Sequence, residues 1–214
     1  MKRIFVFVLS VLLLASCGPQ YTEPVEASQV GFAVSFLKNV NEVTPRGENV
    51  VVSPYSAAIV LSMLAEGAEG KTKEEFYDAL DGVLYKAEDL GSNDTVVVKS
   101  ANAVWIDDDF SPRNRYVSLL EKDFDAFLDV ESFADPATVH AINNWCSEHT
   151  NGKITGIIDR LNPGNVMVLV NALYFNAPWE VKFDPRQTVT QIFNGVTKDS
   201  EVKMMHRKGY YMYA

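Results

Sequence analysis

The side chains that could perform catalysis are serines, histidines and carboxylates, and the chain holds three histidines: His140, His149 and His206. A serine hydrolase needs a nucleophilic serine, a histidine base and an acid that orients the base. His140 and His149 fall on a segment with helical spacing whose apolar side uses other positions, so we expect both to be solvated. The sequence has no G-x-S-x-G motif, which holds a nucleophilic serine on a strained turn. We therefore expect that the protein is not an enzyme.

Three consecutive carboxylates, Asp107, Asp108 and Asp109, are the closest approach to a metal site. A calcium loop spaces its oxygen ligands along the chain and needs a central glycine for its turn. These aspartates are adjacent and precede Phe110-Ser111-Pro112, which is typical of a solvated turn. We expect neither a metal nor a cofactor.

One amide, Asn171, interrupts the apolar run VMVLVNALYF at residues 166–175. An almost unbroken apolar run predicts a strand buried on both faces, since a half-solvated strand would alternate. A buried carboxamide costs roughly 1–3 kcal/mol if its two donors and its acceptor stay unpaired. Asn171 therefore needs an explanation that apolar packing does not provide.

The first residues predict a secretion signal. Lys2 and Arg3 form a basic start, and the apolar stretch Ile4–Leu14 that follows is too short to span a bilayer. Leu14-Ala15-Ser16-Cys17 is similar to the bacterial lipobox, in which the signal is cut before a cysteine that receives the lipid. An ordinary signal peptide with an incidental cysteine is the alternative.

This motif predicts three segments and a location. Residues 1–16 would be the signal peptide, residues 17–27 the lipidated Cys17 and a polar tether, and residues 28–214 a single domain. The protein would cross the inner membrane and be lipid-anchored at the bacterial cell envelope, surface-exposed or extracellular. Its membrane contact would be the lipid on Cys17.

Charge and cysteine content exclude several classes of protein. The net charge is −9, and loss of Lys2 and Arg3 with the signal would make it −11. Without a basic stripe, such an acidic chain is a poor candidate for binding nucleic acid. If Cys17 carries a lipid, Cys146 is the one remaining thiol, which excludes disulfide scaffolds and multi-cysteine metal sites.

The segments that must position these residues alternate between helical and strand patterns. Ser53-Pro54 predicts a helix start, and Thr72-Lys73-Glu74-Glu75 predicts a capping box. Together the pieces indicate one α+β domain built on a large sheet. We expect helices at 30–40, 54–66, 72–80, 111–124 and 136–150, and strands at 49–52, 95–106, 126–133, 166–175, 188–193 and 201–213.

The C-terminus stops inside an aromatic, strand-like segment, MMHRKGYYMYA at residues 204–214, with no cap or polar tail after it. A strand ending there would leave unpaired backbone and exposed tyrosines. We expect that this sequence is a truncated piece of a longer protein.

Taken together, five segments resemble the serpin family, in the order and nearly at the spacing of that family. The resemblance implies the serpin fold, a large central mixed β-sheet with surrounding helices, of which this chain would hold only the N-terminal portion. The segments are NVVVSPYSAAIVLSMLAEGAEGKTKEEF at 49–76, SANAVWID at 100–107, INNWCSEHTNGKI at 142–154, LVNALYFNAPWEVKFDPRQT at 169–188 and VKMM at 202–205.

The resemblance also implies roles for single residues. Ser53, Ser56 and Asn171 would form the "shutter", a polar gate beneath the part of the sheet that opens. Trp179 would lie at the "breach", where the inserting loop first enters. The reactive-site bond would lie beyond Ala214.

The implied activity is inhibition of serine proteases, or of cysteine proteases, by suicide-substrate loop insertion. The chain alone would then be inactive, because it lacks the reactive loop. A non-inhibitory serpin-fold lipoprotein with a binding or structural role is the alternative, and a hydrolase ranks last.

Overall fold

A three-stranded sheet is the centre of the computed structural model, which describes residues 27–162 and 164–210. The predicted signal peptide and Cys17 lie outside the described residues. The strand order is β2-β1-β3, and the strands are β1 (Val97–Asp107), β2 (Ala126–Glu131) and β3 (Met167–Asn176). β1 runs parallel to β2 and antiparallel to β3, pairing with β3 from Val97↔Asn176 to Ile106↔Met167. Within the described residues, β3 is paired on one side only.

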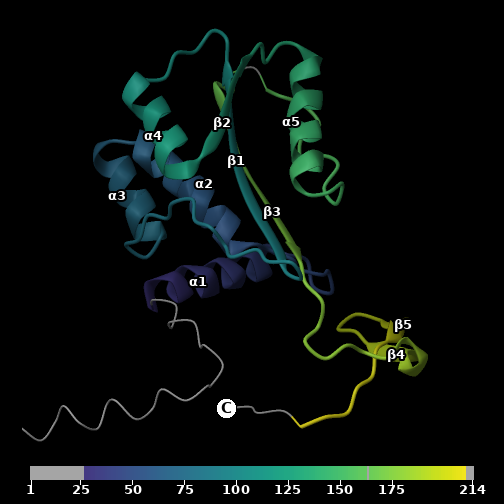
Figure 1. The fold of residues 1–214 in the computed structure, drawn as a ribbon. Coiled ribbons are helices and arrows are strands. Elements are labelled where there is room, and N and C mark those ends of the chain that lie inside the picture. Colours follow the sequence, from purple (N-terminus) through teal and green to yellow (C-terminus); the bar gives the residue numbers. More distant parts are fainter. Residues whose placement is uncertain (1–26, 163, 211–214) are drawn as a thin grey trace, which may run out of the picture.

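Helices cover both faces of this sheet, as Figure 1 shows. α5 (Pro136–His149) lies on one face, and α2 (Pro54–Gly67) and α4 (Asn114–Phe124) lie on the other. Two further helices, α1 (Ala27–Val43) and α3 (Gly70–Ala79), pack against α2. The sheet therefore has two hydrophobic cores, one on each side.

Side-chain alternation along β1 divides these two cores. Ala103 and Trp105 point toward α5, where the Trp105 ring meets Trp145 edge-on with centroids 5.6 Å apart. Val104 and Ile106 point the other way, against α2 and α4. As the middle strand with both faces covered, β1 is buried without a break from residue 102 to 106.

The prediction that the strand around Asn171 is buried on both faces is therefore only partly correct. Asn171 itself is half-buried, and the end of β3 is exposed, with Phe175 67% accessible. The physical reason is position, because an edge strand leaves one side and one end without neighbours.

Local signals set the start of α2 and α5 as predicted. The Ser53 hydroxyl accepts a hydrogen bond from the Ser56 amide, and Pro54 occupies the first turn of α2. Asp135 caps α5 in the same way through the Ala137 amide. After α5 the chain turns through Asn151 and Gly152 at φ 51° and 70°.

Other boundaries differ from the predictions. Residues 49–52 form no strand, because no described strand pairs with them. α3 begins at Gly70, so Thr72 lies within its first turn and does not cap it. α4 begins at Asn114, three residues after the predicted start at 111.

The last elements form a separate hairpin, seen beyond the end of β3 in Figure 1. A short 3-10 helix (Pro185–Gln187) leads into β4 (Val189–Asn194), which pairs antiparallel with β5 (Asp199–Met204). The final predicted strand thus ends at Met204, not at 213. None of the described helices combines the length and apolar character that a membrane span requires.

Candidate conformational site at the β1–β3 seam

Asn171 uses both of its amide hydrogens to bridge β3 and β1. Its Nδ2 donates to Ser100 Oγ at 2.9 Å and to Asn102 Oδ1 at 2.8 Å. Asn102 stands directly opposite Asn171 in the antiparallel register, and Ser100 lies two residues before it on the same face. The carbonyl oxygen of the Asn171 side chain is buried and has no hydrogen-bond partner in the described chain.

Asn102 extends this polar contact to α4. It is 4% exposed, and its Nδ2 donates to the Phe124 carbonyl at 2.6 Å, at the C-terminal end of α4. The amide of Asn102 is therefore fixed by one neighbouring strand and one helix end. Such satisfied buried polar groups specify one arrangement of the elements that they join.

Ser53 and Ser56 form their own pair. The Ser53 hydroxyl donates to the Ser56 hydroxyl at 2.9 Å, and no hydrogen bond in the described chain joins either serine to Asn171. Tyr55, which lies between the two serines in the sequence, has a buried hydroxyl oxygen without a hydrogen-bond partner among the described residues. Burial raises the pKa of Tyr55, and the Ser100 hydroxyl beside it opposes that rise without completing a hydrogen bond.

Trp179 lies just past β3, on the surface. It is 64% exposed, and its ring meets Phe183 edge-on with centroids 5.5 Å apart. The structure therefore keeps it away from both hydrophobic cores and from the Asn171 contacts.

Two of the other candidate residues for metal binding or catalysis, Asp107 and His149, make structural contacts. Asp107 accepts hydrogen bonds from the amides of Asp109 and Phe133, so its two oxygens fix a turn. The prediction of solvated histidines was wrong for His149, which is half-buried and stacked on Trp145 at 4.1 Å. His140 is exposed, as predicted.

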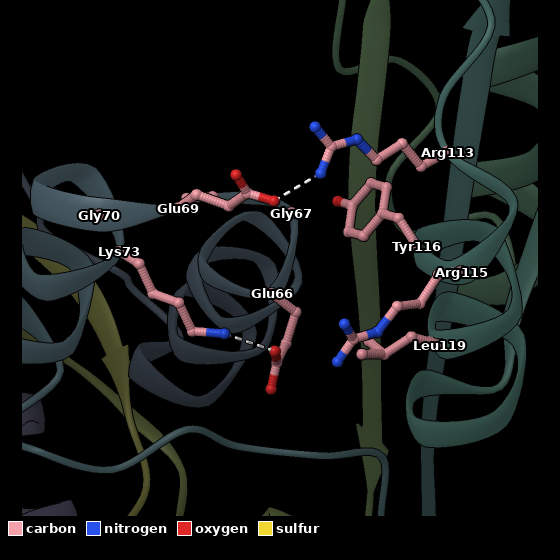
Figure 2. A pocket seen from close by; sticks show the side chains of 10 residues that line it. Glu66, Gly67, Glu69, Gly70, Lys73, Arg113, Arg115, Tyr116 and Leu119 are labelled. Carbon is pink, nitrogen blue, oxygen red and sulfur yellow. Dashed lines mark hydrogen bonds and ion pairs between the residues drawn. The ribbon is translucent and has the colours of Figure 1, made fainter.

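A pocket of about 300 Å³ separates the end of α2 from α4, and its charges are largely paired. Figure 2 shows Lys73 on Glu66, 2.9 Å apart, and Arg113 on Glu69. The Tyr116 ring closes the wall beside Gly67, and its hydroxyl donates to the Met63 carbonyl at 2.9 Å. This arrangement joins α4 to α2 and α3 without offering a reactive group.

Comparison with known proteins identifies the family. The sequence profile of a family described as "Serpin (serine protease inhibitor)" matches residues 27–214. The chain belongs to the serpin family. Serpins in general inhibit proteases and are not themselves enzymes.

The curated relatives are considerably longer than the part of them that matches this chain. Mouse Serpin B11 is 31% identical over 222 residues, which cover 90% of this chain and 57% of the relative. A serine protease inhibitor of Cyanea capillata is 35% identical over 200 residues, covering 85% and 52%. This serpin chain spans about half the length of the curated relatives that it matches.

Solved structures confirm the serpin fold and its partial coverage. The native state of the thermophilic serpin Tengpin matches with a TM-score of 0.75 at 27% identity, over 86% of this chain and 51% of that one. A loop C-sheet serpin polymer matches with the same TM-score at 26% identity, over 87% and 53%. The expected fold, the N-terminal portion of a serpin, is confirmed.

Sequence reasoning missed Ser100 and Asn102, the two partners of Asn171. Their signal was present, because polar residues two apart in a strand share a face. What was missing was the register that sets them opposite Asn171. The gate role of Ser53, Ser56 and Asn171 and the breach role of Trp179 stay predictions.

Proposed function

We propose that this serpin inhibits proteases as a suicide substrate, with serine or cysteine proteases as targets. The protease would cleave an exposed loop and form an acyl-enzyme, and the cleaved loop would then add to the central sheet as a strand. Serpin loop insertion is a known case of strand addition to a sheet edge. The loop would belong to residues beyond Ala214, so the 214-residue chain alone would not inhibit.

The observation that carries this proposal is the family profile, which matches residues 27–214. β3 is a ten-residue strand, Met167–Asn176, whose outer edge has no partner among the described strands of a chain that spans about half the length of its relatives. Backbone groups along such an edge accept an added strand by ordinary ladder hydrogen bonds. The unpartnered carbonyl of Asn171 lies on this strand and could accept a hydrogen bond from an added neighbour.

The polar pairing beside that edge supports a sheet that opens. Hydrogen bonds can be exchanged between two arrangements, whereas interlocked apolar side chains resist separation. The Asn171 amide holds β3 to β1, so the two strands would move together while the outer edge of β3 opens. α5, which covers β1 and β3, would have to shift as the new strand enters.

We further propose that Cys17 carries a lipid that anchors the protein at the bacterial envelope. The support is the sequence Leu14-Ala15-Ser16-Cys17 after the apolar stretch. An anchored inhibitor of this kind would protect the cell against proteases arriving from outside.

The test uses the complete polypeptide, including whatever follows Ala214, mixed with a panel of serine and cysteine proteases. At least one protease should form a covalent complex that survives boiling in detergent. The matched control is the same protease with its nucleophile chemically blocked, which should form none. Cleavage of the loop without any such complex contradicts inhibition and favours a non-inhibitory, binding or structural serpin.

A further inference from the structure

A second cavity lies at the edge of β1, just before β2 begins. Pairing with β2 starts at Asn102↔Ala126, so Ser100 and Ala101 have no β2 partner on that side. The space left there is a cavity of about 460 Å³, within the range that small-molecule sites occupy. Every residue that lines it belongs to the described chain.

Negative charge is concentrated among the residues that line this cavity. Glu88, Asp89 and Asp125 line it, all three are exposed, and no lysine or arginine is among its described lining residues. Asp89 accepts a hydrogen bond from the Gly91 amide, so of the three lining carboxylates Glu88 and Asp125 are those without a hydrogen bond to another described residue. The cavity therefore favours a cation.

Aromatic rings form one wall. Phe127 is 48% exposed there, and Trp145 and His149 reach it from α5. The buried Trp105 ring packs edge-on against the Phe127 ring, with centroids 6.0 Å apart, and this contact holds Phe127 in place. Aromatic faces attract organic cations, and a planar guanidinium also forms paired hydrogen bonds with carboxylates.

Two residues of the seam described above, both on β1, are among those that line the cavity. Ser100 and Asn102 line it, and these are the two side chains that accept hydrogen bonds from Asn171. Tyr55, whose hydroxyl lies next to Ser100 and Glu88, is not itself among the residues that line the cavity.

We propose that this cavity binds a small alkylguanidinium cation and that binding tightens the β1–β3 seam through Ser100 and Asn102. The carboxylates would hold the charged head and the aromatic wall would cover its stem. The proposal does not depend on protease inhibition, because each measurement below reports on the ligand or on the seam alone.

Binding is measured by titration calorimetry on the complete polypeptide with n-butylguanidinium as the probe. Its neutral counterpart of similar shape, n-butylurea, should bind at least tenfold more weakly. The double variant Glu88→Gln/Asp125→Asn should lose at least tenfold in affinity for n-butylguanidinium. Asparagine tolerates the left-handed backbone of Asp125, at φ 47°, so the fold should be kept.

The matched control is Glu74→Gln/Glu75→Gln on α3, which removes the same charge at two exposed positions outside the cavity. Its affinity should stay within twofold of the wild type. If both double variants lost the same affinity for n-butylguanidinium, the loss would come from the lower overall charge, and the proposed site would be wrong. Absence of binding to the wild type, or equal binding of n-butylurea, would also overturn it.

Coupling to the seam is measured by amide hydrogen exchange with and without n-butylguanidinium. Amides of β1 and β3 around Asn102 and Asn171 should exchange at least threefold more slowly with the ligand bound. The β4–β5 hairpin serves as an internal reference and should not change. Binding without slower exchange at the seam would overturn the coupling.

Discussion

The two hydrogen bonds of the Asn171 amide cross between strands and do not run along one. They add a side-chain link to the backbone ladder that already joins β3 to β1. Both donors of the amide are used, while its carbonyl oxygen is buried and has no partner among the described residues. A buried acceptor without a partner costs free energy that a donor from another strand can recover.

Replacement of this side chain gives a prediction about sheet opening. Asn171→Leu removes both donors and leaves Asn102 Oδ1 buried without its partner, at a cost of roughly 1–3 kcal/mol. In the complete polypeptide we expect heat-induced conversion to latent or polymeric forms to become at least threefold faster. Conversion is followed on native gels against time at a fixed temperature below the melting midpoint.

Tyr174→Phe is the control for this change. It removes a polar group from the same strand on the opposite face, where the Tyr174 hydroxyl accepts a hydrogen bond from Asn176 and has no side-chain hydrogen bond to β1 among the described residues. Its conversion rate should match the wild type. An unchanged rate in Asn171→Leu would mean that Asn171 is ordinary core filling, even if the melting midpoint falls.

For single residues, the sequence predicted a special role where one residue type interrupts an otherwise regular pattern. Asn171 was singled out because an amide in an apolar run needs partners, and the structure supplies two. The partners could not be named, because Ser100 and Asn102 meet Asn171 only through a register fixed between distant strands. The predicted grouping of Asn171 with Ser53 and Ser56 needed the same tertiary information, and no hydrogen bond joins them in the described chain.

For helices and strands, the features that depend only on neighbouring residues in the sequence, such as helix starts, were predictable. The caps Ser53 and Asp135 act within three residues of themselves, and both helices begin where those caps predict. The strand expected at 49–52 and the long final strand depended on neighbours, which local sequence does not specify. Burial of β3 on both faces failed for the same reason, since its place in the sheet was unknown.

The contact between α4 and α2 gives a prediction about pH. Burial raises the pKa of Tyr116 to about 12, and its hydroxyl donates to the Met63 carbonyl. An unfolded tyrosine ionises near pH 10, so between about pH 10 and 12 unfolding releases a proton that the folded state keeps. The stability from a neutral Tyr116 is therefore complete below pH 10 and is lost as the pH rises toward 12.

Tyr116→Phe isolates this contribution. At pH 7 the variant should be less stable by about 1 kcal/mol, because the Met63 carbonyl loses its donor. Above pH 10 the difference between wild type and variant should shrink, since only the wild type has this hydroxyl to ionise. Urea midpoints at pH 7, 10 and 11 measure it, and two parallel pH curves would contradict the assignment.

At the scale of the whole molecule, the chain combines strong net charge with open apolar surface. Its net charge is −9, which opposes association in general. Against this, β3 has an unpaired edge in the described chain, and its Phe175 is 67% exposed. Ile192 and Phe193 on β4 are 60% and 55% exposed. Edge strands with exposed apolar side chains pair with other copies unless a charge or a cover prevents it.

We therefore expect the 214-residue chain, purified in isolation, to associate reversibly with itself as its concentration rises. Sedimentation velocity over a series of concentrations measures this. Phe175→Lys places a charge at the end of β3 and should weaken association at least fivefold, because lysine on an edge opposes strand pairing. Val43→Lys adds the same charge at the end of α1, where the side chain is 83% exposed, and should leave association unchanged. If the chain were a monomer at every concentration, or if both lysine variants weakened association equally, self-association would not depend on the unpaired edge of β3.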